Sequence, residues 1–368
     1  MTRVVLASFD RLPAPKGASA HILANAAILA ERYDVSLVTL GTEPVAGLRH
    51  RPLFIPEPNW LLRGQEFHRQ VAAVFERYPF DVYHVRSPWE GLAVPPGARI
   101  VYEVNALYSV EVVYAHPGVL ALPAIRRKLR AMELGLLDRC ALVLTPSAVT
   151  ARYLTDLGIG EDKIRVVPNA PSIPFAPVER PRRDVVRLCY VGSLAPWQGL
   201  EELLGVLPRL TAPFRLDVVT GDSERRVRRL RRRIERLGLD GRTTFVEPGP
   251  ATALAAILAE QDIGLAPLAP CERNLVQGCM PVKILDFAAA GLPVLAPDMP
   301  VVREILGPSY PLYRRWSREG LLRRLGELAG SHTLRLDLGA EAQEAVRLRC
   351  APETQRARLL EAYDRVLA

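Results

Sequence analysis

Short apolar runs rich in β-branched residues alternate with segments of helical periodicity along the whole chain. This alternation is typical of parallel sheets whose strands are joined by helical crossovers, and it excludes most other fold classes. The first series of predicted strands comprises Val4–Ser8, Val35–Thr39, Val82–His84, Ile100–Tyr102, Leu142–Thr145 and Ile164–Val167. The second comprises Arg187–Val191, Arg215–Val219, Thr243–Val246, Ile263–Ala266 and Pro293–Ala296. We therefore predict an α/β protein with two doubly wound, Rossmann-like domains.

A proline-rich stretch separates the two series. Residues 168–181 contain P-N-A-P-S-I-P-F-A-P and are predicted to form a linker. A chain of 368 residues is too long for one compact core and suits two domains. We place the N-terminal domain at residues 1–168 and the second domain at residues 169–350. Residues 351–368 are predicted to form a C-terminal helix.

Composition excludes several classes of protein. A hydrophobic content of 49% with 24% charged residues is typical of a soluble globular chain. No apolar run is long enough to span a bilayer, and the first ten residues suit a buried strand better than a secretory signal. The five cysteines are scattered and lack a C-x-x-C pair. They indicate reduced thiols, a cytoplasmic location and no structural zinc site.

The net charge of +8 comes almost wholly from arginine. Its densest cluster, residues 225–236, spells an amphipathic helix. No aromatic interleaving or nucleic-acid motif accompanies these arginines, so we predict a solvated helix face and no nucleic-acid partner. A weak attraction to anionic lipid headgroups stays open, which would place the protein at the inner face of a membrane.

Lys283 is an electrostatic oddity, because it falls in the first turn of a helix predicted to open at Pro281. A cation there adds to the positive end of the helix dipole and is disfavoured unless an anion binds. Asp286, one turn later on the same face, can accept hydrogen bonds from a diol. The pair suits the phosphate and the ribose of a nucleotide.

Glycines follow several of the predicted strands. Gly17 precedes the first helix, Gly192 and Ser193 follow one strand of the second series, and Gly221 follows the next. Backbone amides in such loops can approach a phosphate closely, although each glycine alone is also an ordinary turn. The fingerprint G-x-G-x-x-G is absent, which counts against a nicotinamide enzyme.

Polar residues also gather at strand ends in the first domain. They occur in H-V-R-S-P-W-E after the third predicted strand and in E-V-N-A-L-Y-S-V-E after the fourth, which includes Asn105. Such groups can recognise the hydroxyls of a sugar, or they can simply cap helices and turns. His21 is either a general base or a helix residue with no catalytic part.

Taken together, five segments resemble a retaining glycosyltransferase of the GT-B fold, family 4. They are K-G-A-S-A-H, R-S-P-W-E, V-P-N, Y-V-G-S-L-A-P-W-Q-G and R-N-L-V-Q-G-C-M-P-V-K-I-L-D-F-A-A-A-G-L-P-V. The resemblance implies two Rossmann-like domains facing across a cleft, with a nucleotide-sugar in the second domain and an acceptor in the first. It also implies a C-terminal helix that crosses back to the first domain. The family's ribose-binding glutamate falls on Asp286, and its glycine loop falls on Gly192.

The chain departs from the family pattern at four positions. The acidic residue that often contacts the donor sugar is replaced by Gly278, and the usual phosphate-binding arginine and lysine fall on Ser193 and Gln198. The histidine often found in the first domain is replaced by Asn105. Phosphate charge would then be met by Lys283, by Arg273 and by backbone amides.

We therefore expect transfer of a sugar from a nucleoside diphosphate-sugar to a hydroxyl of a sugar, lipid-linked or small-molecule acceptor, as in glycan, glycolipid or glycosylated-metabolite biosynthesis. The resemblance implies retention, whereas a base at His21 would give inversion. The predicted catalytic residues are Lys283, Asn105 and His21. The predicted donor-binding residues are Gly17, Gly192, Ser193, Gln198, Gly221, Arg273, Lys283, Ile284 and Asp286.

No D-x-D-like metal site is apparent, so neither a metal nor another cofactor is expected. Two alternatives remain. A sugar-nucleotide epimerase would share the architecture, and the lost acidic and basic positions would also suit a catalytically weakened binding subunit.

Overall fold

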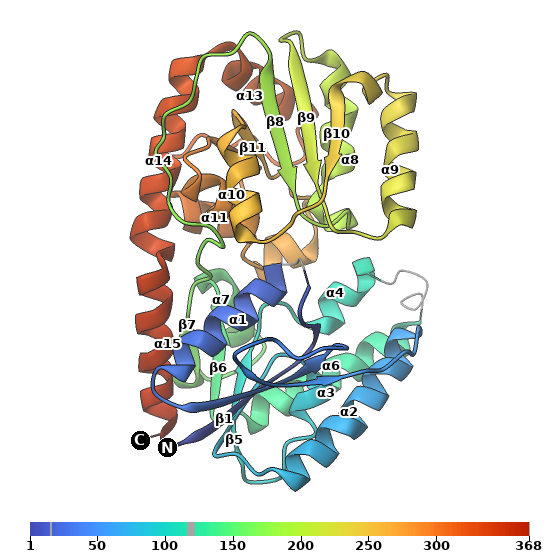
Figure 1. The fold of residues 1–368 in the computed structure, drawn as a ribbon, viewed down its shortest axis with the longest axis vertical. Helices are drawn as coiled ribbons and strands as arrows, with labels where there is room; N and C mark the ends of the chain where they lie inside the picture. Colours follow the sequence, from blue (N-terminus) through green and yellow to red (C-terminus); the bar gives the residue numbers. More distant parts are fainter. Residues whose placement is uncertain (15–16, 116–121, 368) are drawn as a thin grey trace. The chain divides into compact units, whose positions relative to one another are not determined.

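The computed structural model describes residues 1–14, 17–115 and 122–367 of the chain. Within them the chain divides into two compact units (Figure 1). The first unit comprises Met1–Pro168 together with Glu353–Ala368, and the second comprises Asn169–Pro352. Lys16, which precedes Gly17 in the predicted glycine loop, lies outside the described residues.

The first unit is built on a seven-stranded sheet with the order β3-β2-β1-β4-β5-β6-β7, and all its strand pairs are parallel. The strands are β1 (Arg3–Arg11), β2 (Asp34–Leu40), β3 (Arg49–Leu53), β4 (Val82–Val85), β5 (Arg99–Glu103), β6 (Leu142–Thr145) and β7 (Ile164–Val166). The sequence prediction missed β3, because R-H-R-P-L has only Leu53 buried, as suits a strand at the edge of a sheet.

Helices cover both faces of this sheet. They are α1 (Gly17–Ala30), α2 (Trp60–Arg77), α3 (Pro88–Gly91), α4 (Tyr108–Ala115), α6 (Pro123–Arg139), α7 (Ala148–Asp156), the short 3-10 turn η1 (Glu161–Lys163) and α15 (Pro352–Leu367). The C-terminal helix α15 belongs to this core, since Leu359 and Tyr363 are buried in one hydrophobic cluster with Val4, Val82 and Val101 of the sheet. The last helix of the chain therefore packs on its first strand.

The second unit has a five-stranded parallel sheet with the order β10-β9-β8-β11-β12. Its strands are β8 (Val186–Val191), β9 (Phe214–Val219), β10 (Thr243–Val246), β11 (Ile263–Leu265) and β12 (Val294–Leu295). Both sheets thus confirm the predicted doubly wound α/β class. The strand order reverses between β8 and β11 in this sheet and between β1 and β4 in the other. Ligands in such sheets bind beyond the carboxyl ends of the strands at this switch point.

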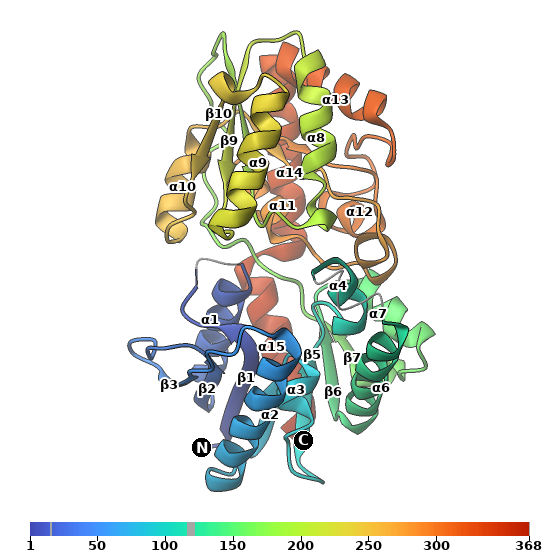
Figure 2. The same ribbon diagram turned by 90° about the vertical axis from the view of Figure 1, so that its right-hand side faces the viewer.

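The helices of the second unit lie on both faces of its sheet. They are α8 (Leu200–Val206), α9 (Glu224–Arg236), α10 (Ala251–Ala259), α11 (Val282–Ala289), α12 (Pro300–Leu306), α13 (Arg318–Gly330) and α14 (His332–Cys350). Short turns add η2 (Pro196–Gln198), η3 (Leu207–Arg209), η4 (Asp240–Arg242) and the π-helical η5 (Arg273–Gln277). Figure 2 shows α8 and α9 side by side on one face and α10 on the other.

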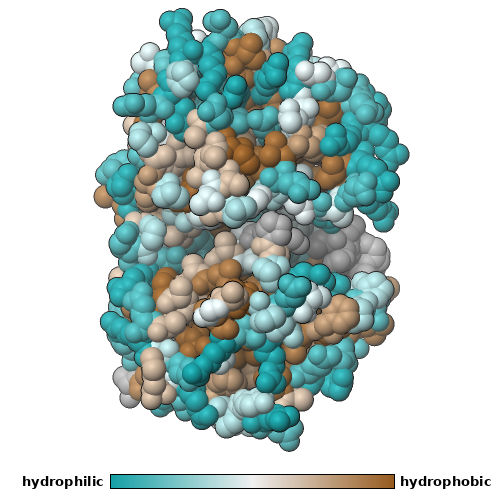
Figure 3. Space-filling model, viewed as in Figure 1, coloured by the Kyte–Doolittle hydropathy of each residue, from teal (hydrophilic) through white to brown (hydrophobic). Residues whose placement is uncertain are grey.

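The arginine-rich segment forms α9, as the periodicity predicts. Leu230 and Ile234 are buried, while the predicted inward residues Val227 and Leu237 are only half-buried. The arginines lie at the surface, and the outer side of α9 is hydrophilic in Figure 3. No helix in the described part of the chain is both long enough and apolar enough to cross a membrane.

The packing of α11 on the sheet generates a stability prediction. A Cβ at Gly264 of β11 would lie 2.3 Å from Cγ of Phe287, whose side chain is fully buried. Gly264→Ala should therefore lower the free energy of unfolding by about 1–3 kcal/mol through overpacking. Gly205→Ala in α8, where a Cβ meets nothing within 4 Å, should instead raise it by about 0.5–1 kcal/mol. Urea denaturation measures both, and a Gly264→Ala protein as stable as the wild type would contradict this packing.

Candidate functional site

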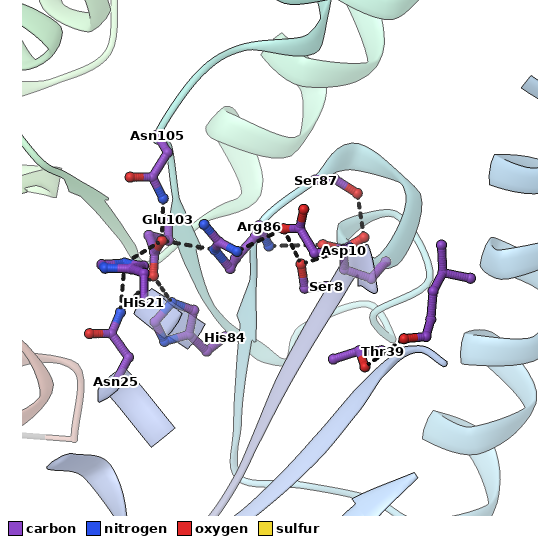
Figure 4. A network of polar contacts seen from close by, with 12 residues as sticks. Ser8, Asp10, His21, Asn25, Thr39, His84, Arg86, Ser87, Glu103 and Asn105 are labelled. Carbon is purple, nitrogen blue, oxygen red and sulfur yellow. Dashed lines mark hydrogen bonds and ion pairs between the residues drawn. The ribbon is translucent and has the colours of Figure 1, made fainter. Parts of the chain in front are cut away.

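A buried carboxylate organises the carboxyl edge of the sheet in the first unit. Glu103 is the last residue of β5, and only 4% of it is exposed. Figure 4 shows the side chains of neighbouring elements converging on it. Its Oε1 accepts from His21 Nε2 at 2.9 Å, from Arg86 Nε at 2.8 Å and from Asn105 Nδ2. Its Oε2 accepts from Asn25 Nδ2 at 2.8 Å and from His84 Nε2 at 3.1 Å.

These donors keep Glu103 ionised. Burial by itself raises the pKa of a carboxyl group, but the Arg86 guanidinium and the hydrogen bonds from His21 and His84 outweigh it and hold the pKa of Glu103 well below its usual range. A second nitrogen of Arg86 donates to Asp10 at 2.8 Å. The cluster thus combines one buried negative charge with a cation shared between two carboxylates.

The structure places two of the predicted catalytic residues in this cluster. A carboxylate only accepts hydrogen bonds, so a neutral His21 carries its proton on Nε2 and has Nδ1 as its acceptor atom; Asn25 Nδ2 lies 3.1 Å from the same Nε2. Asn105 points its amide nitrogen at Glu103, which leaves its carbonyl oxygen as an acceptor (Figure 4). Gly17 is the first residue of α1, and a Cβ there would meet nothing within 4 Å.

The second unit buries a cation instead. Lys283 lies in the first turn of α11, whose N-cap is Pro281, and only 7% of the residue is exposed. Its Nζ makes no hydrogen bond within the part of the chain that the structure describes. The ammonium lies 4.1 Å from the centre of the Tyr190 ring. Burial lowers the pKa of Lys283 to about 7.

Gly192, directly after β8, leaves room for the Lys283 side chain to lie against the backbone. Its φ of +134° is a conformation that side chains rarely adopt, and an added Cβ would lie 3.1 Å from Lys283 Nζ. The Gly192 amide donates to the Val219 carbonyl at 3.0 Å, as part of the sheet ladder. The absence of a side chain at Gly192 therefore lets the backbone lie close to the Lys283 ammonium. The Gly192 amide itself is not free for a ligand, because it donates to Val219.

The loop after β8 is held by its neighbours. The Ser193 carbonyl accepts a 2.5 Å hydrogen bond from the Tyr190 hydroxyl. The Leu194 amide donates at 2.9 Å to Asp222, which follows Gly221 at the end of β9. The side-chain oxygen of Gln198 is buried and has no hydrogen-bond partner among the described residues. Ser193, Gln198 and Gly221 thus all lie at the carboxyl edge of the second sheet.

Three further positions flank Lys283 in the sequence. The Arg273 guanidinium lies 5.0 Å from the Trp197 ring centre and donates to Asn274 Oδ1 at 3.2 Å. Gly278 ends η5 with φ +75° and ψ 42°, a left-handed conformation that costs most residues with a side chain about 1–2 kcal/mol. The backbone therefore favours glycine where the family often carries an acid. Ile284 is fully buried, and its amide donates to the Pro281 carbonyl at 3.0 Å.

Asp286 has a partner that sequence reasoning missed. Its Oδ1 accepts hydrogen bonds from the amide and the hydroxyl of Ser172, at 2.6 and 2.8 Å. Burial raises the pKa of Asp286 to about 6, against the opposing effect of Ser172. This carboxyl group therefore ties the linker segment to α11. The sequence offers only a weak signal for the contact, a serine directly after the asparagine–alanine–proline of the linker.

A surface hollow of about 560 Å³ lies elsewhere in the first unit. Its lining includes Arg3, Asp34 and Arg49, which begin β1, β2 and β3, so it opens at the amino ends of these strands. Arg49 is paired with Asp34 there. Because ligands of doubly wound sheets bind at the opposite edge, we do not assign the site to this hollow. Among the described residues no group of three or more His, Cys, Asp or Glu could hold a metal ion.

Two protein-family models match the chain. Residues 15–171 match the model of glycosyltransferase family 4, and residues 186–328 match that of glycosyl transferases group 1. Among curated proteins, none matches the sequence significantly.

Many solved structures share the fold. Sucrose-phosphate synthase from Thermosynechococcus elongatus is 16% identical, with a TM-score of 0.81 over 100% of this chain and 99% of its own. WaaG, a glycosyltransferase involved in lipopolysaccharide biosynthesis, is 17% identical with a TM-score of 0.72 over 97% and 98%. HepE of Anabaena, solved with UDP and glucose, is 14% identical with a TM-score of 0.74 over 99% and 100%. At these identities the likeness shows the fold.

The buried lysine generates a stability prediction. The pKa of Lys283 falls from 10.5 to about 7 on folding, so between these values the unfolded chain binds more protons and stability rises with pH. Lys283→Met should therefore stabilise the ligand-free protein by roughly 2–4 kcal/mol at pH 7, and by less as the pH approaches 10. Chemical denaturation across this pH range measures the effect. Lys128→Met, at an exposed position of α6, is the matched control and should change little. Equal stability of the two variants at pH 7 would contradict the burial of a costly ammonium.

Proposed function

Because the chain is a GT-B glycosyltransferase of the family 4 type, we propose that it takes a sugar from a nucleoside diphosphate-sugar and transfers it to an acceptor hydroxyl. The observation that carries this proposal is Lys283, a buried ammonium with no hydrogen-bond partner among the described residues. A buried cation is stable only when an anion or several acceptors compensate its charge. A diphosphate supplies that charge.

The start of α11 completes an anion site around Lys283. The N-cap Pro281 has no side chain that could accept from the first-turn amides, so these donors suit a phosphate. Gly192 brings the backbone after β8 within reach of the same ammonium. We assign to Lys283 and α11 the stabilisation of the negative charge that develops as the nucleoside diphosphate departs.

The remaining donor contacts follow the family pattern. We assign the ribose to Asp286 and the rest of the nucleotide to the neighbouring loops of the second unit, with contacts from Gly192, Ser193, Gln198, Gly221, Arg273 and Ile284. A donor contact of Gly17, in the first unit, stays a prediction from the sequence. The fold of HepE, solved with UDP and with UDP-glucose, supports a nucleotide-sugar donor. No metal enters this mechanism, because a helix N-terminus and a lysine take the place of a divalent cation.

The Glu103 cluster provides the acceptor chemistry in the first unit. His21 and Asn105 both donate to Glu103 Oε1, and His21 Nδ1 and the Asn105 carbonyl oxygen are the acceptor atoms that can bind the hydroxyl of an incoming sugar or other alcohol. Retention is the outcome that the family resemblance implies. Direct attack assisted by His21 as a base would give inversion instead.

The first test is nucleotide binding. Lys283→Met should weaken the affinity for the preferred nucleoside diphosphate by about 10- to 100-fold, since a charge-assisted hydrogen bond contributes about 1.5–3 kcal/mol. Isothermal titration with UDP, GDP, ADP and dTDP measures this and identifies the base. Lys128→Met should leave the affinity unchanged. Unchanged affinity in Lys283→Met would remove the basis of the donor site.

The same titration has a pH dependence. A bound diphosphate raises the pKa of Lys283 above its value of about 7 in the ligand-free protein, so binding takes up a proton at higher pH. Wild-type affinity should therefore fall by up to tenfold per pH unit above pH 7. Lys283→Met should show no such decline above pH 7. A wild-type affinity that stays constant from pH 7 to 9 would contradict this linkage.

A reaction assay separates transfer from its alternatives. Donor incubated alone tests for isomerisation, which an epimerase would catalyse, and added acceptor alcohols test for transfer. NMR of the product reports the anomeric configuration, and an α product from an α donor establishes retention. The rate should not change with EDTA. Nucleotide binding without turnover of any donor would indicate a binding subunit.

A further inference from the structure

The C-terminal helix reaches the Glu103 cluster through two polar side chains. Tyr363 and Gln355 of α15 are both buried, and they lie beyond residue 328, where the matched family regions end. The Tyr363 hydroxyl lies 2.8 Å from His84 Nδ1, and Gln355 Nε2 donates to Asn25 Oδ1 at 3.0 Å. His84 and Asn25 are the two donors to Glu103 Oε2. Two hydrogen-bonded chains therefore run from α15 to one carboxylate oxygen.

Tyr363 completes the hydrogen bonds of the His84 tautomer that the Glu103 carboxylate requires. Burial and the nearby Glu103 charge raise the pKa of Tyr363 well above its usual range, so its hydroxyl stays protonated. A neutral His84 that accepts this hydroxyl proton at Nδ1 must carry its own proton on Nε2, which faces Glu103. Without the hydroxyl, the buried Nδ1 of this tautomer would lose its hydrogen bond, while the opposite tautomer would place a lone pair against the carboxylate.

Gln355 acts on Asn25 in the same way. An asparagine amide can present either its nitrogen or its oxygen to a neighbour. The Gln355 amide group donates to the Asn25 oxygen, and the Asn25 nitrogen is thereby turned toward Glu103 at 2.8 Å. Without this donor, a rotated Asn25 would set its oxygen against a negative charge.

We propose that Tyr363 and Gln355 are positioning residues, through which the C-terminal helix orients the donors to Glu103 and so supports the Glu103–His21 contact used in acceptor chemistry. Glu103 in turn holds His21 Nε2 at 2.9 Å and leaves Nδ1 for the substrate. This inference rests on the proposed function of the cluster. It gives α15 a part in the reaction in addition to its packing on the sheet.

Packing alone would not require these polar groups. The Tyr363 ring lies 5.5 Å from the Tyr33 ring and belongs to an apolar cluster, so a phenylalanine could fill the same space. Tyr363→Phe therefore removes the hydroxyl and keeps the ring contact. Tyr33→Phe is the matched control, since it changes the other ring of the same pair without touching His84.

The first measurement is independent of activity. In protein labelled with ¹⁵N-histidine, NMR chemical shifts and couplings report which ring nitrogen carries the proton. Wild type and Tyr33→Phe should show His84 as the Nε2–H tautomer only. Tyr363→Phe should show a displaced Nδ1 resonance of His84, because this nitrogen loses its hydrogen bond from the hydroxyl. An unchanged His84 spectrum in Tyr363→Phe would overturn the proposed role of the hydroxyl.

The second measurement is kinetic and uses Tyr363→Phe, Gln355→Met and the double variant. Each single change should lower kcat by about 3- to 10-fold while the KM for the donor stays the same. The double variant should lose more, because both chains end on one oxygen of Glu103. Loss of donors raises the pKa of a carboxylate, so the acid limb of the kcat profile should move to higher pH.

The two measurements separate this inference from the proposed function. If no donor is turned over by the wild type, the transferase proposal fails, while the histidine spectra still test the positioning role. If the wild type is active and all three variants keep its kcat and pH profile, the positioning role is overturned while the transferase proposal stands. A shifted profile in Tyr33→Phe equal to that in Tyr363→Phe would also overturn it, since it would assign the effect to ring packing.

Discussion

Taking a charged side chain out of water costs several kcal/mol unless hydrogen bonds and an opposite charge compensate it. Glu103 in the first unit and Lys283 in the second are two such buried groups, and the structure treats them in opposite ways. Glu103 is fully compensated, with five side chains donating to it. Lys283 makes no hydrogen bond among the described residues, and its ammonium lies against the face of the Tyr190 ring. A compensated charge can orient its neighbours, whereas an uncompensated one is prepared for a ligand of opposite charge.

The departures from the family pattern become coherent in these terms. Ser193 and Gln198 replace basic residues at the edge of the second sheet, and this leaves a buried lysine as the central cation there. Gly278 replaces an acid at a backbone position that a side chain would strain. Under the function proposed above, this neutral loop leaves Lys283 as the main cation available to a bound phosphate.

Much of this could be predicted from the sequence. The succession of strands along the chain, the helix that begins after Pro281 and the unusual position of Lys283 all follow from local patterns. Hydrophobic periodicity, helix caps and helix dipoles act over a few residues. The edge strand β3 was missed, since its polar residues carry no apolar signal. Hydrogen bonds between distant segments left no pattern either. The hydrogen bond of Asp286 joins it to Ser172, 114 positions away, and that of His84 joins it to Tyr363, 279 positions away.

The sequence by itself determined the α/β class, the two series of strands and the residue types available at their ends. Only the tertiary structure decided how those residues are used. It showed that Lys283 is buried without a hydrogen-bond partner among the described residues, that Glu103 collects the polar side chains of several elements, and that α15 supplies two of the contacts behind them. The reason is physical. Burial and hydrogen-bond partnership depend on which segments the fold brings together, and no local pattern along the chain carries that information.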